Sequence, residues 1–187
     1  MTDPPALRVQ QRSTRADGKA HMVTAARELL RHSSPDEVTI REVAEASGHH
    51  HRFVQSWFGG KVGLFREVFD EIVAELAAAA PTVLNRDGIQ PDTRVAARLL
   101  NWLVAADPEA LSGDRPTPLL DTMSESYVAA GLEPGLARRL AVRLLATTLS
   151  MVLFQDALGV RDEEIADYVA LEREMVLLLV AARSADA

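Results

Sequence analysis

The stretch TIREVAEASGHHHRFVQSWFGGKVGLFREVF, residues 39–69, decides the fold of this chain. It opens with Thr39 followed three residues later by Glu42, which is the spacing of a helix-capping box. In a capping box the hydroxyl and the carboxylate satisfy backbone N–H groups that the first helical turn leaves without partners. The pattern therefore predicts a short helix over about residues 40–46.

A second short helix follows directly. Gly48 supplies the positive φ that a chain reversal after the first helix needs. Over residues 50–58, four apolar residues recur at the spacing of one helix face: Phe53, Val54, Trp57 and Phe58. Two short helices joined at a glycine predict a helix-turn-helix, whose second helix presents its exposed face to the major groove of DNA.

The side chains left facing outward in this arrangement are polar. Arginine and glutamine can each grip a base edge with two hydrogen bonds, and groups at a helix start can reach phosphate. We expect DNA contacts from the two short helices and from the start of the next one, at Thr39, Arg41, His49, His50, His51, Arg52, Gln55, Ser56, Trp57 and Lys61.

The run His49–His51 raises the alternative of a metal site. Consecutive residues on a helix point about 100° apart and cannot converge on one ion, so we expect no metal here. Histidine has a reference pKa of about 6.5, so protonation near phosphate predicts that DNA affinity rises as the pH falls from about 8 to about 6. No cofactor is expected.

The rest of the chain predicts an all-α protein of about nine helices, because apolar residues recur at helical spacing and no segment alternates like a strand. Outside the motif, helices are expected over about 19–32, 61–79, 95–104, 119–127, 135–158 and 162–183. The domains expected are a flexible arm at 1–17, a three-helix DNA-binding domain with its connecting helix at 18–80, and a helical dimerisation and effector-binding domain at 92–183. Residues 81–91, rich in proline, asparagine and glycine, mark the junction.

Composition narrows the class of protein. Cysteine is absent, which excludes disulfides and thiolate metal sites. Residues 1–61 hold nine Lys or Arg and seven Asp or Glu, whereas residues 62–187 hold eleven and twenty, so only the front is net positive. A net positive N-terminal region joined to a net negative remainder fits a protein in which only the N-terminal region contacts the phosphates of a nucleic acid. No signal peptide and no membrane span are expected, which predicts a cytoplasmic protein.

Two further expectations concern the body. Five apolar or aromatic residues could line an effector cavity, although a residue of this kind more often belongs to the plain core: Trp102, Met123, Tyr127, Met151 and Phe154. The helices at 135–158 and 162–183 are apolar on more than one face, which favours a homodimer seam over a monomeric core.

The arginines of the arm, Arg8, Arg12 and Arg15, either enter a minor groove or belong to a soluble tail.

The quoted stretch resembles the DNA-binding domain of the TetR family of bacterial transcriptional regulators. The resemblance covers roughly residues 15–75 and rests on the TIREVA opening, Gly48, Phe58, Lys61 and the Leu64-Phe65 pair. The resemblance implies an all-helical homodimer. In such a dimer a ligand pocket in the C-terminal helical domain controls the distance between the two helix-turn-helix motifs that contact DNA. The sequence departs from the family pattern on the reading surface, because His50 replaces the usual Ser or Thr, Arg52 a common glycine, and Gln55 a common tyrosine.

These observations predict a regulator, most simply a repressor, that binds a palindromic double-stranded DNA operator as a homodimer and is released by an unknown small molecule. Two alternatives stay open. One is a helical metal-binding or enzymatic protein that uses His49–His51. The other is an interaction module that no longer reads DNA. No nucleophile motif, phosphate-binding glycine loop or carboxylate–histidine pair favours an enzyme.

Overall fold

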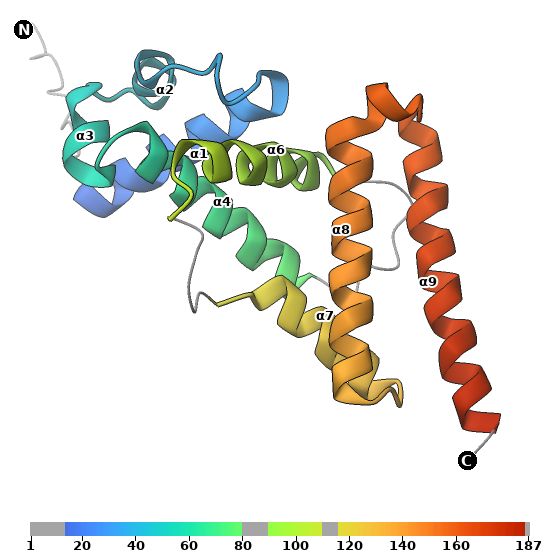
Figure 1. Cartoon of the computed structure of the whole chain (residues 1–187). Coiled ribbons are helices and arrows are strands. Elements are labelled where there is room, and N and C mark those ends of the chain that lie inside the picture. The colour runs from blue at the N-terminus through green and yellow to red at the C-terminus, as the bar shows by residue number, and fades with distance from the viewer. Residues whose placement is uncertain (1–13, 80–89, 110–115, 186–187) are drawn as a thin grey trace, which may run out of the picture.

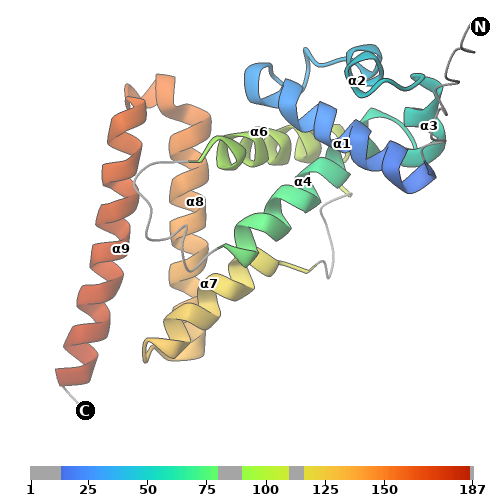
Figure 2. The same ribbon diagram turned by 180° about the vertical axis from the view of Figure 1, so that it is seen from behind.

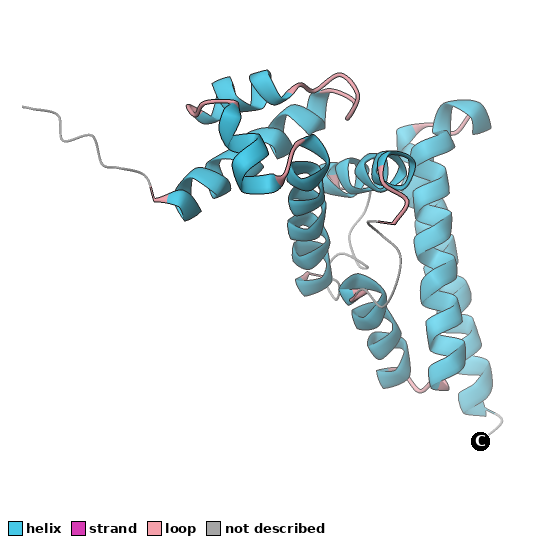
Figure 3. Ribbon diagram, turned by 60° about the vertical axis from the view of Figure 1, so that its left-hand side comes forward, coloured by secondary structure: helices cyan, strands magenta, loops and turns pink. Residues whose placement is uncertain are grey.

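Every regular element of the described chain is an α-helix, as predicted. A computed structural model describes residues 14–79, 90–109 and 116–185 (Figure 3). Its eight helices come close to the predicted number of about nine. They are α1 (Arg15–His32), α2 (Ile40–Ser47), α3 (Arg52–Phe58), α4 (Lys61–Ala78), α6 (Pro91–Ala106), α7 (Pro118–Ala129), α8 (Pro134–Leu158) and α9 (Asp162–Ala185).

Helix α1 begins four residues before its predicted start at Lys19. Thr14 caps it, accepting a hydrogen bond from the Asp17 backbone N–H at 3.2 Å, while the Asp17 carboxylate accepts from the Thr14 N–H at 3.0 Å. The last residues of the predicted arm at 1–17 are therefore helical. Residues 1–13, with Arg8 and Arg12, lie outside the described chain.

Helices α1 to α4 and α6 share one hydrophobic core. Its members come from both predicted domains: Met22, Val23, Ala26, Leu30, Val38, Val43, Val54, Leu64, Phe65, Val68, Ile72, Val95, Ala96, Leu99 and Leu103. The first helix of the body is thus packed into the base of the helix-turn-helix, and α4 runs from the motif down to α7 (Figure 1). Because these helices are packed together without gaps, a displacement of α4 or α6 must also shift α1.

Helices α8 and α9 form an antiparallel pair at the end of the molecule opposite α2 and α3 (Figures 1 and 2). A second core joins α7, α8 and α9 through Met123, Tyr127, Leu132, Ala137, Ala141, Leu144 and Val176. On their other faces the two helices leave large apolar side chains exposed: Val142, Phe154, Leu158, Tyr168, Leu171, Leu177, Leu178 and Leu179.

Helix α8 is long and apolar enough, by length and composition, to cross a membrane, and 17% of its most apolar window is buried inside the chain. It also carries Arg138, Arg139 and Arg143, all exposed. A lipid-facing helix would have to pair or bury such charges at high cost. The exposed arginines therefore favour a helix that packs against protein.

Candidate nucleic-acid interface and internal cavity

The capping box that opens α2 has the predicted geometry. The Thr39 hydroxyl donates to Glu42 Oε2 at 2.8 Å and accepts from the Glu42 backbone N–H at 3.3 Å. The Thr39 backbone N–H also donates to Glu42 Oε2, at 2.7 Å, and this bond together with the one from the hydroxyl holds the pKa of the Glu42 carboxyl below its usual range. Gly48 ends α2 in the left-handed region at φ 71°, as predicted. Both ends of α2 are therefore defined by a capping structure.

The N-cap residue of α3, His51, makes no side-chain capping hydrogen bond, and the histidine before it accepts one instead. His50 Nδ1 accepts a hydrogen bond from the Arg52 backbone N–H at 3.2 Å. The rings of His50 and His51 stack with centroids 4.3 Å apart, and both side chains are exposed. The hydrogen bond satisfies one of the free N–H groups at the helix start. The ring stacking fixes the orientation of the two imidazoles relative to each other.

Four predicted contact residues lie on the outer surface of the motif. Arg41 is exposed in the first turn of α2, and Arg52, Gln55 and Ser56 are exposed along α3. The Arg52 guanidinium lies 5.1 Å from the centroid of the Phe53 ring, a cation–π contact that restrains the side chain at the surface. Together with His50, His51 and Thr39, these residues make up the exposed polar face of α2 and α3.

Two of the predicted residues lie in the seam between α1 and α3, away from this face. His49 is half-buried, with Nδ1 2.7 Å from the Ser47 carbonyl oxygen and its ring against His21 and Trp57. The Trp57 ring stacks on Phe53 at 4.5 Å. Trp57 faces α1 from α3 and His49 faces α1 from the turn before α3, so their part in the geometry is to support α3.

Lys61 occupies the joint between the motif and the body. Its Nζ donates to the Asp36 carbonyl oxygen at 3.3 Å and lies over the rings of Phe65 and Trp102. Desolvation in this half-buried setting lowers the pKa of the Lys61 amine. Trp102 completes the joint by donating from Nε1 to Asp36 Oδ1 at 2.7 Å.

A cluster of ion pairs, formed by Arg27, Arg31, Glu75 and Asp92, fastens α1 to α4 and α6. Arg27 donates to Glu75 Oε1 at 2.8 Å and to Asp92 Oδ2 at 2.7 Å, and Arg31 donates to Asp92 Oδ1 at 2.9 Å. The hydrogen bonds from Arg27 hold the pKa values of both carboxyls below their usual range. We call these four residues the α1 clamp.

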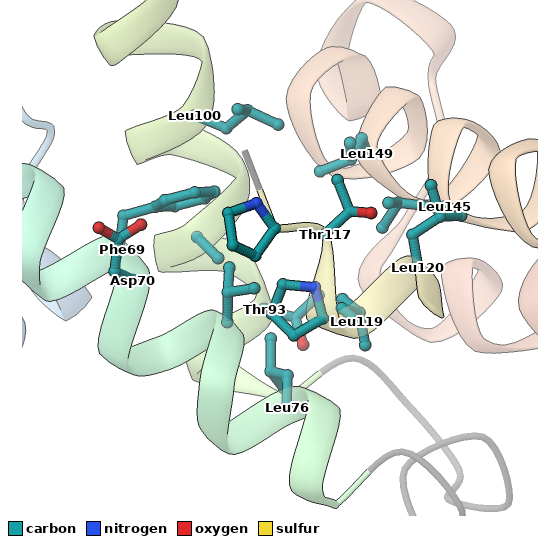
Figure 4. Close-up of a pocket in the computed structure, with 14 residues that line it drawn as sticks. Phe69, Asp70, Leu76, Thr93, Leu100, Thr117, Leu119, Leu120, Leu145 and Leu149 are labelled. Carbon is teal, nitrogen blue, oxygen red and sulfur yellow. The ribbon is translucent and has the colours of Figure 1, made fainter. Parts of the chain in front are cut away.

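A cavity of about 550 Å³ lies between α4, α6, α7 and α8 (Figure 4). Its lining is mainly apolar: Phe69, Asp70, Val73, Leu76, Thr93, Ala96, Leu100, Pro116, Thr117, Pro118, Leu119, Leu120, Leu145 and Leu149. Two lining residues, Leu76 and Thr93, directly follow the clamp carboxylates Glu75 and Asp92 in the sequence. The walls of the cavity and the carboxylates of the clamp therefore belong to the same two helices.

The five residues predicted to bind an effector do not line this cavity. Met123 and Tyr127 are buried in the second core, and Trp102 lies at the joint with Asp36. Met151 is half-buried on α8, and Phe154 is 56% exposed near the end of that helix. Apolar periodicity could not separate lining from core, because the difference depends on how far apart the helices pack.

The histidine run does not form a metal cluster. His49 lies against His21 and Trp57, whereas His50 and His51 stack on each other at the surface. Within residues 14–79, 90–109 and 116–185 no group of three or more His, Cys, Asp or Glu side chains could hold a metal ion.

Comparison with solved structures identifies the fold. The TetR family repressor AlkX from Dietzia sp. strain DQ12-45-1b, implicated in biodegradation of n-alkanes, is 16% identical, with a TM-score of 0.52 over 89% of this chain and 97% of its own. The fatty acid degradation regulator FadR from Bacillus halodurans is 14% identical, with a TM-score of 0.48 over 87% and 94% of the two chains. No family model and no curated protein matches the sequence. The chain thus has the fold of a TetR family repressor, which confirms at the level of fold the resemblance found in residues 15–75.

Proposed function

We propose that this protein is a DNA-binding transcriptional regulator, most simply a cytoplasmic repressor, that reads double-stranded DNA with α3. The observation that carries the proposal is the polar face of α2 and α3. Arg52, Gln55 and Ser56 lie exposed on a short helix held from behind by Val54 and Trp57. Arginine and glutamine at such positions can each recognise one base edge with paired hydrogen bonds.

The regulator acts as a homodimer in this proposal, with a second copy covering the exposed apolar faces of α8 and α9. Eight large apolar side chains exposed on two neighbouring helices are more than an isolated soluble chain leaves to water. A two-fold dimer presents two copies of α3 to one side of the duplex, so the operator is palindromic, with half-sites about 34 Å apart or a multiple of that distance.

A small molecule in the cavity releases the DNA. The cavity is walled by α4 and α6, which also hold α1 through Glu75 and Asp92 of the clamp. A ligand that separates these two helices cannot leave both sets of ion pairs in place. Because α1 packs against α2 and shares the core beneath α3, the change alters how the two readers are spaced.

A gel-shift assay with the DNA just upstream of the protein's own gene, followed by selection from random duplexes, tests the proposal. We expect a specific complex whose affinity falls about a hundredfold or more between about 50 and 200 mM salt. Arg52→Ala should weaken it about tenfold to a hundredfold. Arg161→Ala, an exposed arginine between α8 and α9, is the matched control and should leave the affinity unchanged.

The outcomes separate the alternatives. A chain that selects no duplex, while its helices stay folded, would be an interaction module. A chain whose thermal stability rises with a divalent metal, and falls when His49–His51 are replaced by glutamine, would be a metal-binding protein. Specific DNA binding that survives Arg52→Ala, Gln55→Ala and Ser56→Ala together would refute α3 as the reader.

A further inference from the structure

The start of α3 is held by the side chain of His50 and not by a hydroxyl. Phe53 N–H donates to the His50 carbonyl oxygen at 2.9 Å, and Val54 N–H donates to the His51 carbonyl oxygen at 3.0 Å. A serine or threonine at the N-cap position, residue 51, would accept from these same two N–H groups, which already have partners. The Arg52 N–H lies outside their reach and is satisfied by His50 Nδ1 at 3.2 Å.

The hydrogen bond between His50 and Arg52 has the span of an Asx turn. In an Asx turn, an aspartate or asparagine side chain accepts from the backbone N–H two residues later. Histidine Nδ1 occupies the same place along its side chain as asparagine Oδ1, because both atoms are bonded to Cγ. His50 therefore does the work of an asparagine, with the difference that an imidazole can take up a proton.

One form of the His50 ring can accept this hydrogen bond. Nδ1 is an acceptor in the neutral imidazole that carries its proton on Nε2. A second proton makes both ring nitrogens donors, so Nδ1–H and the Arg52 N–H would then point at each other. Histidine side chains exchange this proton between about pH 5 and 8, whereas asparagine keeps its acceptor throughout that range.

The surroundings of His50 bring no counter-ion to its ring. The ring stacks on His51, and both side chains are exposed. His49 points into the seam with α1, the Arg52 guanidinium lies over a phenylalanine ring, and on α2 the Glu42 carboxylate is held in its own capping box. In the described part of the chain, no carboxylate pairs with either of the two stacked rings. Nothing in this part of the chain therefore compensates the hydrogen bond that protonation removes.

The capped N–H belongs to the residue that we propose as a base reader. Helix α3 has seven residues, which is about two turns, so the turn that begins at Arg52 is half of the helix. The Arg52 guanidinium reaches its place over Phe53 from this turn. A loosened first turn therefore changes the direction in which Arg52 leaves the surface.

We infer that His50 sets the base specificity of Arg52. The neutral ring holds the first turn of α3 in the shape that aims Arg52 at a base edge, and the protonated ring releases it. This inference rests on the proposed function, because it concerns the reading helix of the regulator. Proton uptake near phosphate strengthens binding to every DNA sequence alike, whereas loss of the cap lowers the discrimination between sequences. Discrimination is therefore the quantity to measure.

NMR of the imidazole nitrogens tests the cap on the full-length protein without DNA. At about pH 8 we expect His50 to carry its proton on Nε2. As the pH is lowered to about 5.5, the backbone amide signal of Arg52 should shift with the same midpoint as the His50 ring. A ring with its proton on Nδ1, or an Arg52 amide that does not follow the ring, would overturn the inference.

A binding assay at constant salt tests the effect on specificity. Discrimination is the ratio of the affinities for the selected duplex and for the same duplex changed at one base pair, the one whose preference Arg52→Ala removes. Between about pH 8 and about pH 5.5 we expect this ratio to fall about fivefold or more for the wild type. His50→Asn should keep the high ratio at both pH values. His50→Gln, whose acceptor lies one carbon further from the backbone, should give a low ratio at both.

His32→Gln is the matched control, because it removes an exposed histidine at the end of α1 and should follow the wild type. The wild type and His50→Asn share all other histidines, so a fall in discrimination that persists in His50→Asn would assign the effect to another group and refute the inference. A wild-type ratio that does not depend on pH, or a high ratio for His50→Gln, would refute it as well.

The two tests separate this inference from the proposed function. If the protein selects no duplex, the regulator proposal fails and the role of His50 in base reading fails with it, even where NMR finds the capping form of the ring. If the protein selects a duplex and its discrimination is the same at both pH values, the regulator proposal stands and the inference about His50 fails.

Discussion

At the scale of single residues, one glycine explains how α3 and α4 meet. Gly63 lies in the first turn of α4, where glycine is about 1 kcal/mol less favourable than alanine. A Cβ atom at this position would come 1.7 Å from the Phe58 carbonyl oxygen. The end of the reading helix therefore approaches the start of α4 more closely than any residue with a side chain allows.

Gly63→Ala should lower the free energy of unfolding by more than about 2 kcal/mol, because the clash is with backbone and can be relieved only by moving α3. Urea unfolding followed by circular dichroism measures it. The control is Gly135→Ala, where the added Cβ would meet the flexible Glu133 carboxylate at 3.1 Å. That variant should stay within about 1 kcal/mol of the wild type. Equal effects of the two substitutions would contradict the close approach at Gly63.

Sequence reasoning succeeded where a local rule acts. Thr39, Glu42 and Gly48 define α2 through contacts three to five residues apart, and these were predicted correctly. Thr14 and Asp17 form a second capping box, but the residues around them are polar and show no apolar periodicity. The start of α1 was therefore predicted four residues too late. Apolar spacing put Trp57 on the inner face of its helix, but the inward placement of His49 could not be predicted, because it depends on α1 lying over that residue.

At the scale of elements, the clamp is what ties the reader to the body. Arg27 and Arg31 are one turn apart on α1, and their carboxylate partners come from α4 and α6. From the sequence alone, the four clamp residues would be placed on the solvent-exposed faces of three separate helices. Their convergence depends on the crossing of α1 with the other two helices, which no local pattern encodes.

Asp92→Asn should lower the free energy of unfolding by about 1–2 kcal/mol at about pH 7, since Arg27 and Arg31 then lose the half-buried carboxylate they share and each keeps only its more exposed partner, Glu75 or Glu28. The pKa of Asp92 lies below its usual value of 3.8, chiefly because of the Arg27 hydrogen bond. A carboxyl with a lowered pKa stabilises the fold above its usual pKa, and the benefit is lost as the pH falls through the lowered pKa. The difference between variant and wild type should thus shrink below about pH 4.

Urea titrations of both proteins at a series of pH values measure this difference. Glu163→Gln removes a carboxylate that is 71% exposed in its pair with Arg161, and its effect should stay below about 0.5 kcal/mol. A difference for Asp92→Asn that is no larger than this control, or that grows toward acid pH, would rule out the clamp as a stabilising feature.

At the scale of the whole molecule, the polar face of α2 and α3 and the exposed apolar faces of α8 and α9 are far apart. The polar face lies at one end of the molecule and the α8–α9 pair at the other (Figure 1). The sequence predicted this division, because its charge and its apolar periodicity change along the chain. It did not predict the cavity, whose lining residues come from four helices separated by up to 80 residues. Helical spacing identifies which residues face inward and leaves the gap between helices undetermined.

Leu178→Glu should convert a dimer, with twice the 20.4 kDa mass of one chain, into a monomer. Leu178 is 64% exposed on α9, so the substitution should leave the isolated fold intact while placing a charge in the apolar seam. Light scattering after size-exclusion chromatography measures the mass. Val128→Glu, at a 41% exposed position on α7, should remain dimeric. A wild-type protein that is monomeric at high concentration would disprove the proposed seam.

The hydrogen bond between Trp102 and Asp36 has a practical consequence. The chain contains two tryptophans, Trp57 on the inner side of α3 and Trp102 at the joint between α6 and the loop before α2. Their emission spectra report separately on the two ends of the signalling route once Trp57→Phe or Trp102→Phe isolates each indole. The protein therefore carries its own optical probes, and stopped-flow mixing with a candidate effector can test, without an attached dye, whether a change reaches α3.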